Sequence, residues 1–368
     1  MTTTSGEHGV LDGPVLVIGS GLIGASVALS LRRAGVDVLL ADVDADNLAV
    51  AVDAGAGRPV SSGDEPTLVV AAVPPRHAPH VLAEASARYP AATLTDVTSV
   101  KIGVISAALD LGADPVRLVG GHPMAGREVS GAAGARADLL DDRLWVLTPL
   151  PANGVAHVRQ VHRLVSACGA YPVELGLDEH DAAEALVSHA PQVLSSVLAG
   201  RLVDADPARV RIAGQVLRDM TRIAGSNVSL WTDILSANAG QVADVIDAIV
   251  SDLSATSAAL RQVEAEGGEP VAGVERMLAT GVAGQERIPG KHGAAPAPTR
   301  EITVMLADRP GQLAALFTAI GEASINLEDV RIEHVLGRPS GLVGLTVRPD
   351  HGDLLIAALT ERDFDVRA

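Results

Sequence analysis

Residues 15–35 read VLVIGSGLIGASVALSLRRAG, and VDVLLADVD follows at residues 36–44. A short apolar run, a glycine-rich turn, a stretch with helical periodicity and a second apolar run predict a βαβ unit. Gly19, Gly21 and Gly24 occupy the three glycine positions of G-x-G-x-x-G. In that pattern the first glycine permits a tight turn, the second lets backbone approach a pyrophosphate, and the third allows close helix packing. The stretch therefore predicts a dinucleotide-binding Rossmann unit.

The residues around this unit extend the predicted cofactor site. Asp42 ends the second apolar run, where an acid bonds the ribose 2′-hydroxyl of NAD. The same carboxylate would repel a 2′-phosphate, and no arginine follows it, so NAD is favoured over NADP. The backbone of Leu22 and Ile23 begins the helix that faces the phosphates. Val73, at the end of the next apolar run, completes the predicted site.

Composition excludes several classes of protein. Of the 368 residues 48% are hydrophobic, and no apolar run reaches the length of a membrane span. A net charge of −17 without a basic stretch argues against nucleic acid or an anionic membrane as partner. The single cysteine, Cys168, forms no intrachain disulfide, and no metal-ligand spacing is found, so no metal is expected. The first residues lack the pattern of a signal peptide, and we expect a cytoplasmic protein.

The pattern of predicted secondary structure changes twice along the chain. Alternating strand and helix patterns predict a Rossmann domain over residues 13–151, in an α/β fold. Residues 152–285 have an almost wholly helical pattern, and residues 286–299 form a linker rich in proline, glycine and alanine. Residues 300–368 predict a compact βαββαβ domain. Long apolar helices such as LVSHAPQVLSSVLAGRLV (186–203) predict an all-helical dimerisation domain and a homodimer.

A single histidine stands in GGHPMAGRE, residues 120–128. His122 ends a predicted strand, and ligands of open α/β sheets bind at the carboxyl ends of the strands. We therefore expect His122 at the same edge as the cofactor. Its small neighbours are interpreted as room for a ligand to approach the backbone.

Three features occur together: the Rossmann unit with its acid, TDVTSVK (95–101) followed by GGHPMAG, and RDMTRIAGS (218–226) in a helical stretch. Together they resemble the prephenate dehydrogenase family, which includes arogenate and cyclohexadienyl dehydrogenases. The resemblance implies that C4 of a cyclohexadiene ring gives a hydride to NAD⁺ while the C4 hydroxyl loses its proton and the C1 carboxylate leaves as CO₂. His122 matches the family's catalytic histidine, and an imidazole is suited to accept that proton near neutrality.

The resemblance also assigns residues beside the histidine. Ser99 matches a serine that orients the histidine and touches the substrate hydroxyl, although a simple turn cap remains an alternative. Glu128 matches an acid near the mouth of the site, and a surface ion pair is its alternative. Lys101, at a predicted helix start, is interpreted as solvated.

Further residues are expected to bind the substrate. Arg222 is the candidate for holding a substrate carboxylate, with Asp219 three residues earlier to orient it; a plain intrahelical ion pair is the alternative. His189 lies in SHAPQ, where many members have SHLPH, so Gln192 replaces a histidine. Because glutamine carries no charge, the choice between prephenate and arogenate stays open.

The last 69 residues resemble an ACT domain, a small amino-acid-sensing module. Asp308, Gly311 and Asn326 are its expected ligand-binding positions, with tyrosine as the effector. A module that only strengthens dimerisation is the alternative. For the whole chain, a non-catalytic NAD-linked amino-acid sensor and a β-hydroxyacid dehydrogenase also remain open, although the central lysine motif expected of the latter is not found.

Overall fold

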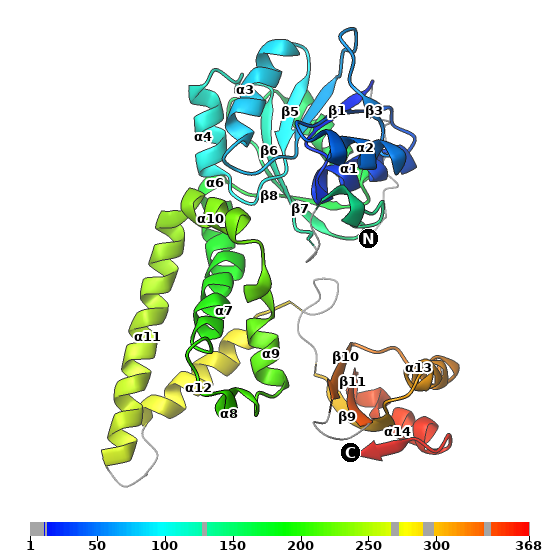
Figure 1. Cartoon of the computed structure of the whole chain (residues 1–368), viewed down its shortest axis with the longest axis vertical. Coiled ribbons are helices and arrows are strands. Elements are labelled where there is room, and N and C mark those ends of the chain that lie inside the picture. Colours follow the sequence, from blue (N-terminus) through cyan, green and yellow to red (C-terminus); the bar gives the residue numbers. More distant parts are fainter. Residues whose placement is uncertain are drawn as a thin grey trace. The chain divides into compact units, whose positions relative to one another are not determined.

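The computed structural model describes residues 11, 13–126, 131–265, 272–289, 298–334 and 340–367. The chain forms two compact units, residues 1–249 and 250–368, and the division falls inside the long helix α11 (Ala239–Ala265). Figure 1 shows the elements of both units.

The first unit contains an eight-stranded sheet of order β3-β2-β1-β4-β5-β6-β7-β8. Strands β1 to β6 are parallel, as a Rossmann domain requires, whereas β7 pairs antiparallel with β6 and parallel with β8. The parallel part is therefore the predicted nucleotide-binding fold. The strands are β1 (Val15–Ile18), β2 (Val38–Ala41), β3 (Arg58–Pro59), β4 (Leu68–Ala71), β5 (Thr93–Asp96), β6 (Leu118–Pro123), β7 (Leu144–Thr148) and β8 (Tyr171–Glu174).

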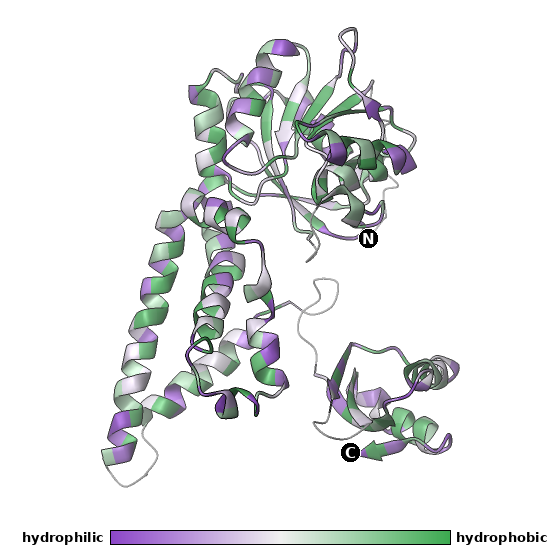
Figure 2. Cartoon of the chain, viewed as in Figure 1, coloured by the Kyte–Doolittle hydropathy of each residue, from purple (hydrophilic) through white to green (hydrophobic). Residues whose placement is uncertain are grey.

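Helices cover both faces of this sheet, and they divide its core into two apolar clusters. Alternate residues of the central strands point to opposite faces: Val15 and Val17 pack in one cluster, and Leu16 in the other. Strands β1, β2 and β4 are buried on both sides and apolar along their length, and Figure 2 colours such apolar residues green. The helices are α1 (Leu22–Arg33), α2 (Ala45–Asp53) and α5 (Val155–Ala167) on the first cluster, and α3 (Ala78–Arg88) and α4 (Ile102–Asp110) on the second.

The sheet continues beyond residue 151, where the sequence analysis ends the first domain. Helix α5 packs on the sheet, and β8 then adds an outer strand beside β7. The α/β part therefore extends to Glu174. The predicted boundary at residue 151 lies too early, because one helix and one four-residue strand do not stand out from the helical pattern that follows.

Helices fill the rest of the first unit, from Leu177 as expected. A π-helical turn, η2 (Ala185–His189), joins the first two of them. In the described residues no helix has the length and apolarity needed to cross a membrane. The elements are α6 (Leu177–Glu184), α7 (Ala190–Gly200), α8 (Pro207–Val210), α9 (Gln215–Thr221), the 3₁₀ turn η3 (Arg222–Gly225) and α10 (Val228–Ala237).

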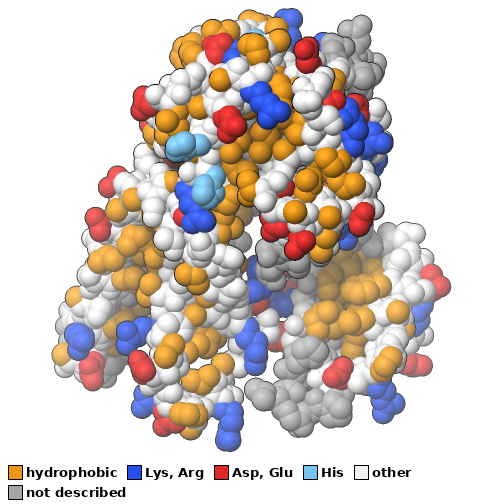
Figure 3. Space-filling view, turned by 45° about the horizontal axis from the view of Figure 1, so that its top comes forward, with side chains coloured by type: hydrophobic (Ala, Val, Ile, Leu, Met, Phe, Trp, Pro, Cys, Tyr) orange, Lys and Arg blue, Asp and Glu red, His pale blue; other side chains and the backbone are white. Residues whose placement is uncertain are grey.

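Apolar side chains reach the surface of this helical segment, which Figure 3 shows in orange. A single chain leaves them in water, so a face of this kind commonly marks an interface. The exposed residues on α6–α10 and the turns between them include Leu186, Val187, Leu194, Val197, Val203, Ile212, Val216, Met220 and Val228.

The second unit holds the end of α11, helix α12 (Ala272–Gln285) and the predicted βαββαβ domain. Its antiparallel sheet has the order β10-β11-β9-β12, and it packs two helices through its own apolar cluster. The expected element order is confirmed. The elements are β9 (Arg300–Ala307), α13 (Gln312–Glu322), β10 (Asp329–His334), β11 (Ser340–Val347), α14 (Gly352–Thr360) and β12 (Asp365–Arg367). Most of the expected linker lies outside the described residues.

Candidate active site

The glycine-rich turn joins β1 to α1 at the carboxyl edge of the sheet. Gly19 has a φ of +101°, and a Cβ there would lie 2.2 Å from the carbonyl oxygen of Ala72. A Cβ on Gly24 would lie 1.9 Å from the Gly19 carbonyl oxygen, so the helix packs directly on the turn. Nothing lies within 4 Å of a Cβ on Gly21. The first and third glycines thus serve tight packing, and the second leaves its surface open.

Asp42 directly follows β2 and reaches the same turn. Its carboxylate accepts hydrogen bonds from the backbone amides of Ser20 and Asp44, at 2.5 and 2.8 Å. The predicted acid therefore stands beside the glycines. Leu22 and Ile23 form the first turn of α1, and Val73 is half-buried just after β4. All seven predicted cofactor residues lie at this edge.

His122 is buried near the end of β6, also at the carboxyl edge. The glycines before it are needed for packing: a Cβ on Gly120 would meet Thr148 Oγ1 at 2.2 Å, and one on Gly121 would meet the Asp96 carbonyl oxygen at 2.7 Å. For these two glycines the interpretation that they leave room for a ligand is therefore wrong. They are small because neighbouring strands crowd β6 on both sides.

Lys101 is completely buried, so the expectation of a solvated lysine is wrong. Its Nζ forms an ion pair with Asp96 and donates to the Gly121 carbonyl oxygen at 2.7 Å. Asp96 Oδ1 in turn accepts from the Gly121 amide at 3.1 Å. Burial lowers the pKa of Lys101, while Asp96 acts to raise it. The buried Lys101–Asp96 pair therefore binds both the carbonyl oxygen and the amide of Gly121, the residue before His122.

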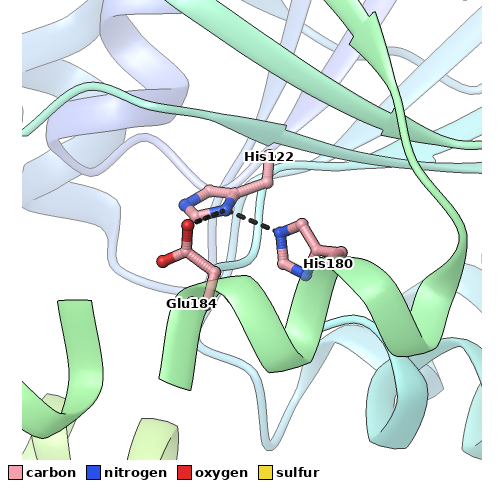
Figure 4. Close-up of side chains that lie close together, drawn as sticks. All are labelled: His122, His180 and Glu184. Carbon is pink, nitrogen blue, oxygen red and sulfur yellow. Dashed lines mark hydrogen bonds and ion pairs between the residues drawn. The ribbon is translucent and has the colours of Figure 1, made fainter. Parts of the chain in front are cut away.

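Two residues of α6 reach His122 from the helical segment, as Figure 4 shows. His122 Nδ1 lies 2.9 Å from His180 Nε2 and 3.9 Å from Glu184 Oε1. All three side chains are buried. Their ligand atoms lie within 4.8 Å of one another, a spacing that a metal ion could also use. The short ring-to-ring contact is itself a hydrogen bond that occupies both nitrogens.

The surroundings of His122 determine its charge. Burial lowers its pKa well below the ordinary value of 6.5, and His180, Lys101 and His189 lower it further. Burial raises the pKa of Glu184 to about 7, with a further contribution from Asp181. His122 is therefore neutral at pH 7, the form that accepts a proton.

His189 lies at the end of the π-helical turn and is fully buried. Asn238 Nδ2 donates to the Asp181 carbonyl oxygen at 2.8 Å, which fixes the orientation of its amide, and contacts His189 Nδ1 at 3.1 Å. Nδ1 is thus the acceptor, and the proton of neutral His189 sits on Nε2. That buried Nε2 has no hydrogen-bond partner in the described part of the chain. Trp231 packs edge-on against the ring, at 6.1 Å between centroids.

No ion pair between Asp219 and Arg222 is seen among the described residues. Helix α9 ends before Arg222, and the Asp219 carboxylate accepts from Gln215 at 2.8 Å. Arg222 is exposed at the start of η3. Buried Gln192 donates to the carbonyl oxygen of Ile223 at 3.0 Å, so it supports the turn that carries Arg222.

Ser99 is half-buried in the turn after β5. Among the described residues no hydrogen bond joins it to His122, whose ring partner is His180 instead. The predicted orienting role of Ser99 is therefore not seen, and its contact with substrate stays a prediction. Glu128 lies outside the described residues.

Residues 27–174 match the nucleotide-binding domain of prephenate dehydrogenase, and residues 177–270 match its dimerization domain. The probable prephenate dehydrogenase NovF of Streptomyces niveus is 34% identical over 95% of this chain and 98% of its own length. The chain belongs to the prephenate dehydrogenase family.

Other members of the prephenate dehydrogenase family agree with this result. The Bacillus subtilis prephenate dehydrogenase is 28% identical over 91% of this chain and 92% of its own. The crystal structure of the Aquifex aeolicus enzyme in complex with hydroxyphenyl propionate and NAD⁺ has a TM-score of 0.67 and 26% identity, and covers 75% of this chain and 98% of that one. The two matched domains meet between β8 and α6.

His180, Asp181 and Glu184 belong to this site, although no motif in the sequence marks them. His180 and Glu184 stand four residues apart on one helix, so they share a face. That spacing was the available signal. It is weak, because acids and histidines at this distance are common on solvated helices.

Proposed function

We propose that this protein catalyses the NAD-dependent oxidative decarboxylation of prephenate to 4-hydroxyphenylpyruvate, a step of tyrosine biosynthesis. One observation carries the proposal beyond the family: His122 is a buried, neutral imidazole at the same sheet edge as the glycine-rich turn. A base in that position can take a hydroxyl proton from a substrate held against the cofactor.

The turn fits NAD. The open surface of Gly21 leaves space for a pyrophosphate above the first amides of α1, and Asp42 stands where the ribose hydroxyls would bind. Bound NAD⁺ supplies the acceptor for the hydride that leaves C4 of the ring. The NAD⁺ in the complex of the Aquifex aeolicus relative supports this assignment.

Three residues are assigned to the substrate. Arg222 binds a carboxylate, because a guanidinium presents a planar pair of donors to its two oxygens. His189 offers its Nε2–H, since a buried donor without a partner is costly until a ligand accepts from it. Ser99 contacts the C4 hydroxyl. Glu128 and Asp219 are proposed as further residues of the substrate-binding site. Gln192 acts indirectly, because its hydrogen bond to Ile223 holds the turn that carries Arg222.

The reaction then needs the protein to accept one proton. The C4 hydroxyl loses its proton to His122 as the hydride leaves the same carbon. Loss of the C1 carboxylate as CO₂ makes the ring aromatic, which favours the forward direction. The protein positions the ring and holds the proton.

Arogenate is the alternative substrate, because neutral Gln192 stands where many members carry a histidine. The test is a side-by-side assay of prephenate and arogenate with NAD⁺, following NADH. We expect reduction of NAD⁺ with at least one of them, and poor use of NADP⁺. Failure of both substrates would reject the proposed function, and preference for arogenate would change its substrate.

The pH profile provides a prediction about the base. Because its pKa is depressed, His122 should stay unprotonated as the pH falls through 6.5. Glu184, with a pKa of about 7, should add a separate small step to the pH profile of kcat/KM near neutrality as its carboxyl group ionises. In Glu184→Gln that step should vanish, and kcat/KM should stay level from pH 7.5 to 6.5 and fall only below. A single loss centred at or above pH 6.5 in this variant would show that another group titrates.

We also propose a homodimer formed by the helical segment. Its exposed apolar side chains and its match to a dimerization domain support this. Sedimentation at micromolar concentration should give twice the chain mass, and a monomer would contradict the proposal.

The C-terminal domain is proposed to bind tyrosine as an ACT module. Gly311 immediately precedes α13 with a φ of +89°, and no atom lies within 4 Å of a Cβ there. Strands β9 and β10 both run antiparallel to β11, so Asp308 and Asn326 lie at opposite ends of one sheet. Helix α13 separates them by about 16 Å. One amino acid can contact both segments only where two modules meet.

Truncation tests this assignment. A chain ending at Gly290 should keep dehydrogenase activity and lose most of its inhibition by tyrosine, because the effector must bind a less active arrangement more tightly to inhibit. Asn326→Ala in the full chain should weaken inhibition in the same direction. Equal inhibition of the truncated and full-length enzymes would place tyrosine in the active site instead.

A further inference from the structure

Asp181 is a buried carboxylate that accepts hydrogen bonds from two elements. The backbone amides of Lys101 and Ile102, at the start of α4, donate to it at 2.8 Å each, and His180 Nδ1 lies 2.7 Å from its Oδ1. Burial acts to raise the pKa of Asp181, but these hydrogen bonds outweigh burial and the pKa falls. The positive end of the α4 dipole points the same way. Asp181 is therefore ionised.

An ionised carboxylate only accepts, which fixes the proton positions of both rings. His180 must carry its proton on Nδ1 to donate to Asp181. With its Nδ1–H donated to Asp181, His180 offers Nε2 as an acceptor, so the proton in the contact with His122 sits on Nδ1 of His122. The other nitrogen of His122, Nε2, is left with a free lone pair. The three residues form the Asp181–His180–His122 network.

We propose that Asp181 and His180 are positioning residues that hold His122 in the tautomer whose Nε2 accepts the substrate's hydroxyl proton, and that the negative charge of Asp181 stabilises the imidazolium which results. The inference rests on the proposed function. In the step, the substrate O–H bond breaks and an Nε2–H bond forms. The positive charge then lies next to His180, with the negative charge of Asp181 beyond it.

Other titratable groups around His122 make this network necessary. Lys101, from the start of α4, and His189, from the π-helical turn, both lower the pKa of His122, as do burial and His180. Each of them therefore disfavours the imidazolium. Asp181 and, when ionised, Glu184 on α6 are the acids that oppose them. Without Asp181 the proton transfer would produce a buried charge with little compensation.

The decisive variant is Asp181→Asn. Its amide can reverse the proton positions, so that His180 Nε2–H donates to His122 and the proton of His122 moves to Nε2. We expect kcat to fall at least about 100-fold, the scale of a lost general base, while KM for substrate and for NAD⁺ change less than about threefold. His122→Asn and the double variant should be equally slow, because both changes act on one proton transfer. Additive losses, or a kcat of Asp181→Asn within tenfold of wild type, would overturn the proposal.

His180→Gln covers the case in which Asp181→Asn fails to fold, because it leaves the cap on α4 intact. It should lower kcat in the same way and should not slow His122→Asn further. The matched control is His162→Gln. It breaks an exposed histidine–carboxylate pair between His162 on α5 and Glu174 on β8. The control should retain wild-type kcat.

A spectroscopic measurement separates this inference from the reaction itself. In full-length protein labelled with ¹⁵N-histidine, the resonances that disappear in His122→Asn should show a bare Nε2 and a protonated Nδ1. In Asp181→Asn the same resonances should show the opposite tautomer, with a protonated Nε2 and a bare Nδ1. This result holds whichever substrate is used. A bare Nδ1 in wild type, or activity that is lost to a chelator and restored by Zn²⁺, would replace the network with another assignment.

Discussion

His122→Asn should lower kcat with prephenate at least about 100-fold, the contribution expected of a positioned general base. Asparagine can still donate a hydrogen bond toward His180 Nε2, where His122 Nδ1 now lies at 2.9 Å. Packing at the end of β6 is therefore preserved, and the loss is confined to the nitrogen that accepts the proton. The measurement is steady-state NADH formation at saturating substrate.

Binding of NAD⁺, followed by calorimetry, should be unchanged in this variant, because His122 is not assigned to the cofactor. His162→Asn, at the surface pair with Glu174, is the control for introducing an asparagine. Near-normal turnover of His122→Asn would remove the residue from its assigned role. Loss of NAD⁺ binding would show instead that the edge of the sheet is disturbed.

Arg222→Ala should raise KM for prephenate by roughly 10- to 100-fold, because a hydrogen bond to a charged group contributes about 1.5–3 kcal/mol. Arg222→Lys should lie between wild type and Ala, since lysine keeps the charge but not the planar pair of donors. Arg218, exposed one turn earlier on α9, provides the matched control Arg218→Ala. If KM rises equally in both alanine variants, the effect is a general loss of positive charge and the carboxylate binds elsewhere.

Much of the fold could be predicted because its determinants are local. Apolar runs and three glycines specify the βαβ unit, and Gly19 and Gly24 pack as the pattern requires. The position of His122 at the carboxyl edge followed from its place at the end of a predicted strand. The antiparallel β7 did not follow, and it is β7 that places Thr148 against Gly120.

The residues that set the state of His122 could not be predicted, because they meet only through long-range packing. His180 is 58 residues from His122, and Asp181 lies 80 residues from the amide of Lys101 that it accepts from. Nothing local marks such a pairing. Lys101 looks like a surface residue in sequence, and only its pairing with Asp96 explains why a charge is tolerated in the core.

The hydrogen bond between β6 and α6 also constrains how the protein can evolve. His122 belongs to the nucleotide-binding domain, whereas the ring that directs its proton belongs to the segment matched to the dimerization domain. Recombination at their border, between residues 174 and 177, would preserve both folds, but His122 and His180 would then come from different parent proteins. A chimaera of two relatives inherits a competent base only if the incoming helix carries a histidine and an acid at the positions of His180 and Asp181. The border between the domains is thus a poor crossover point, although it is a clean structural one.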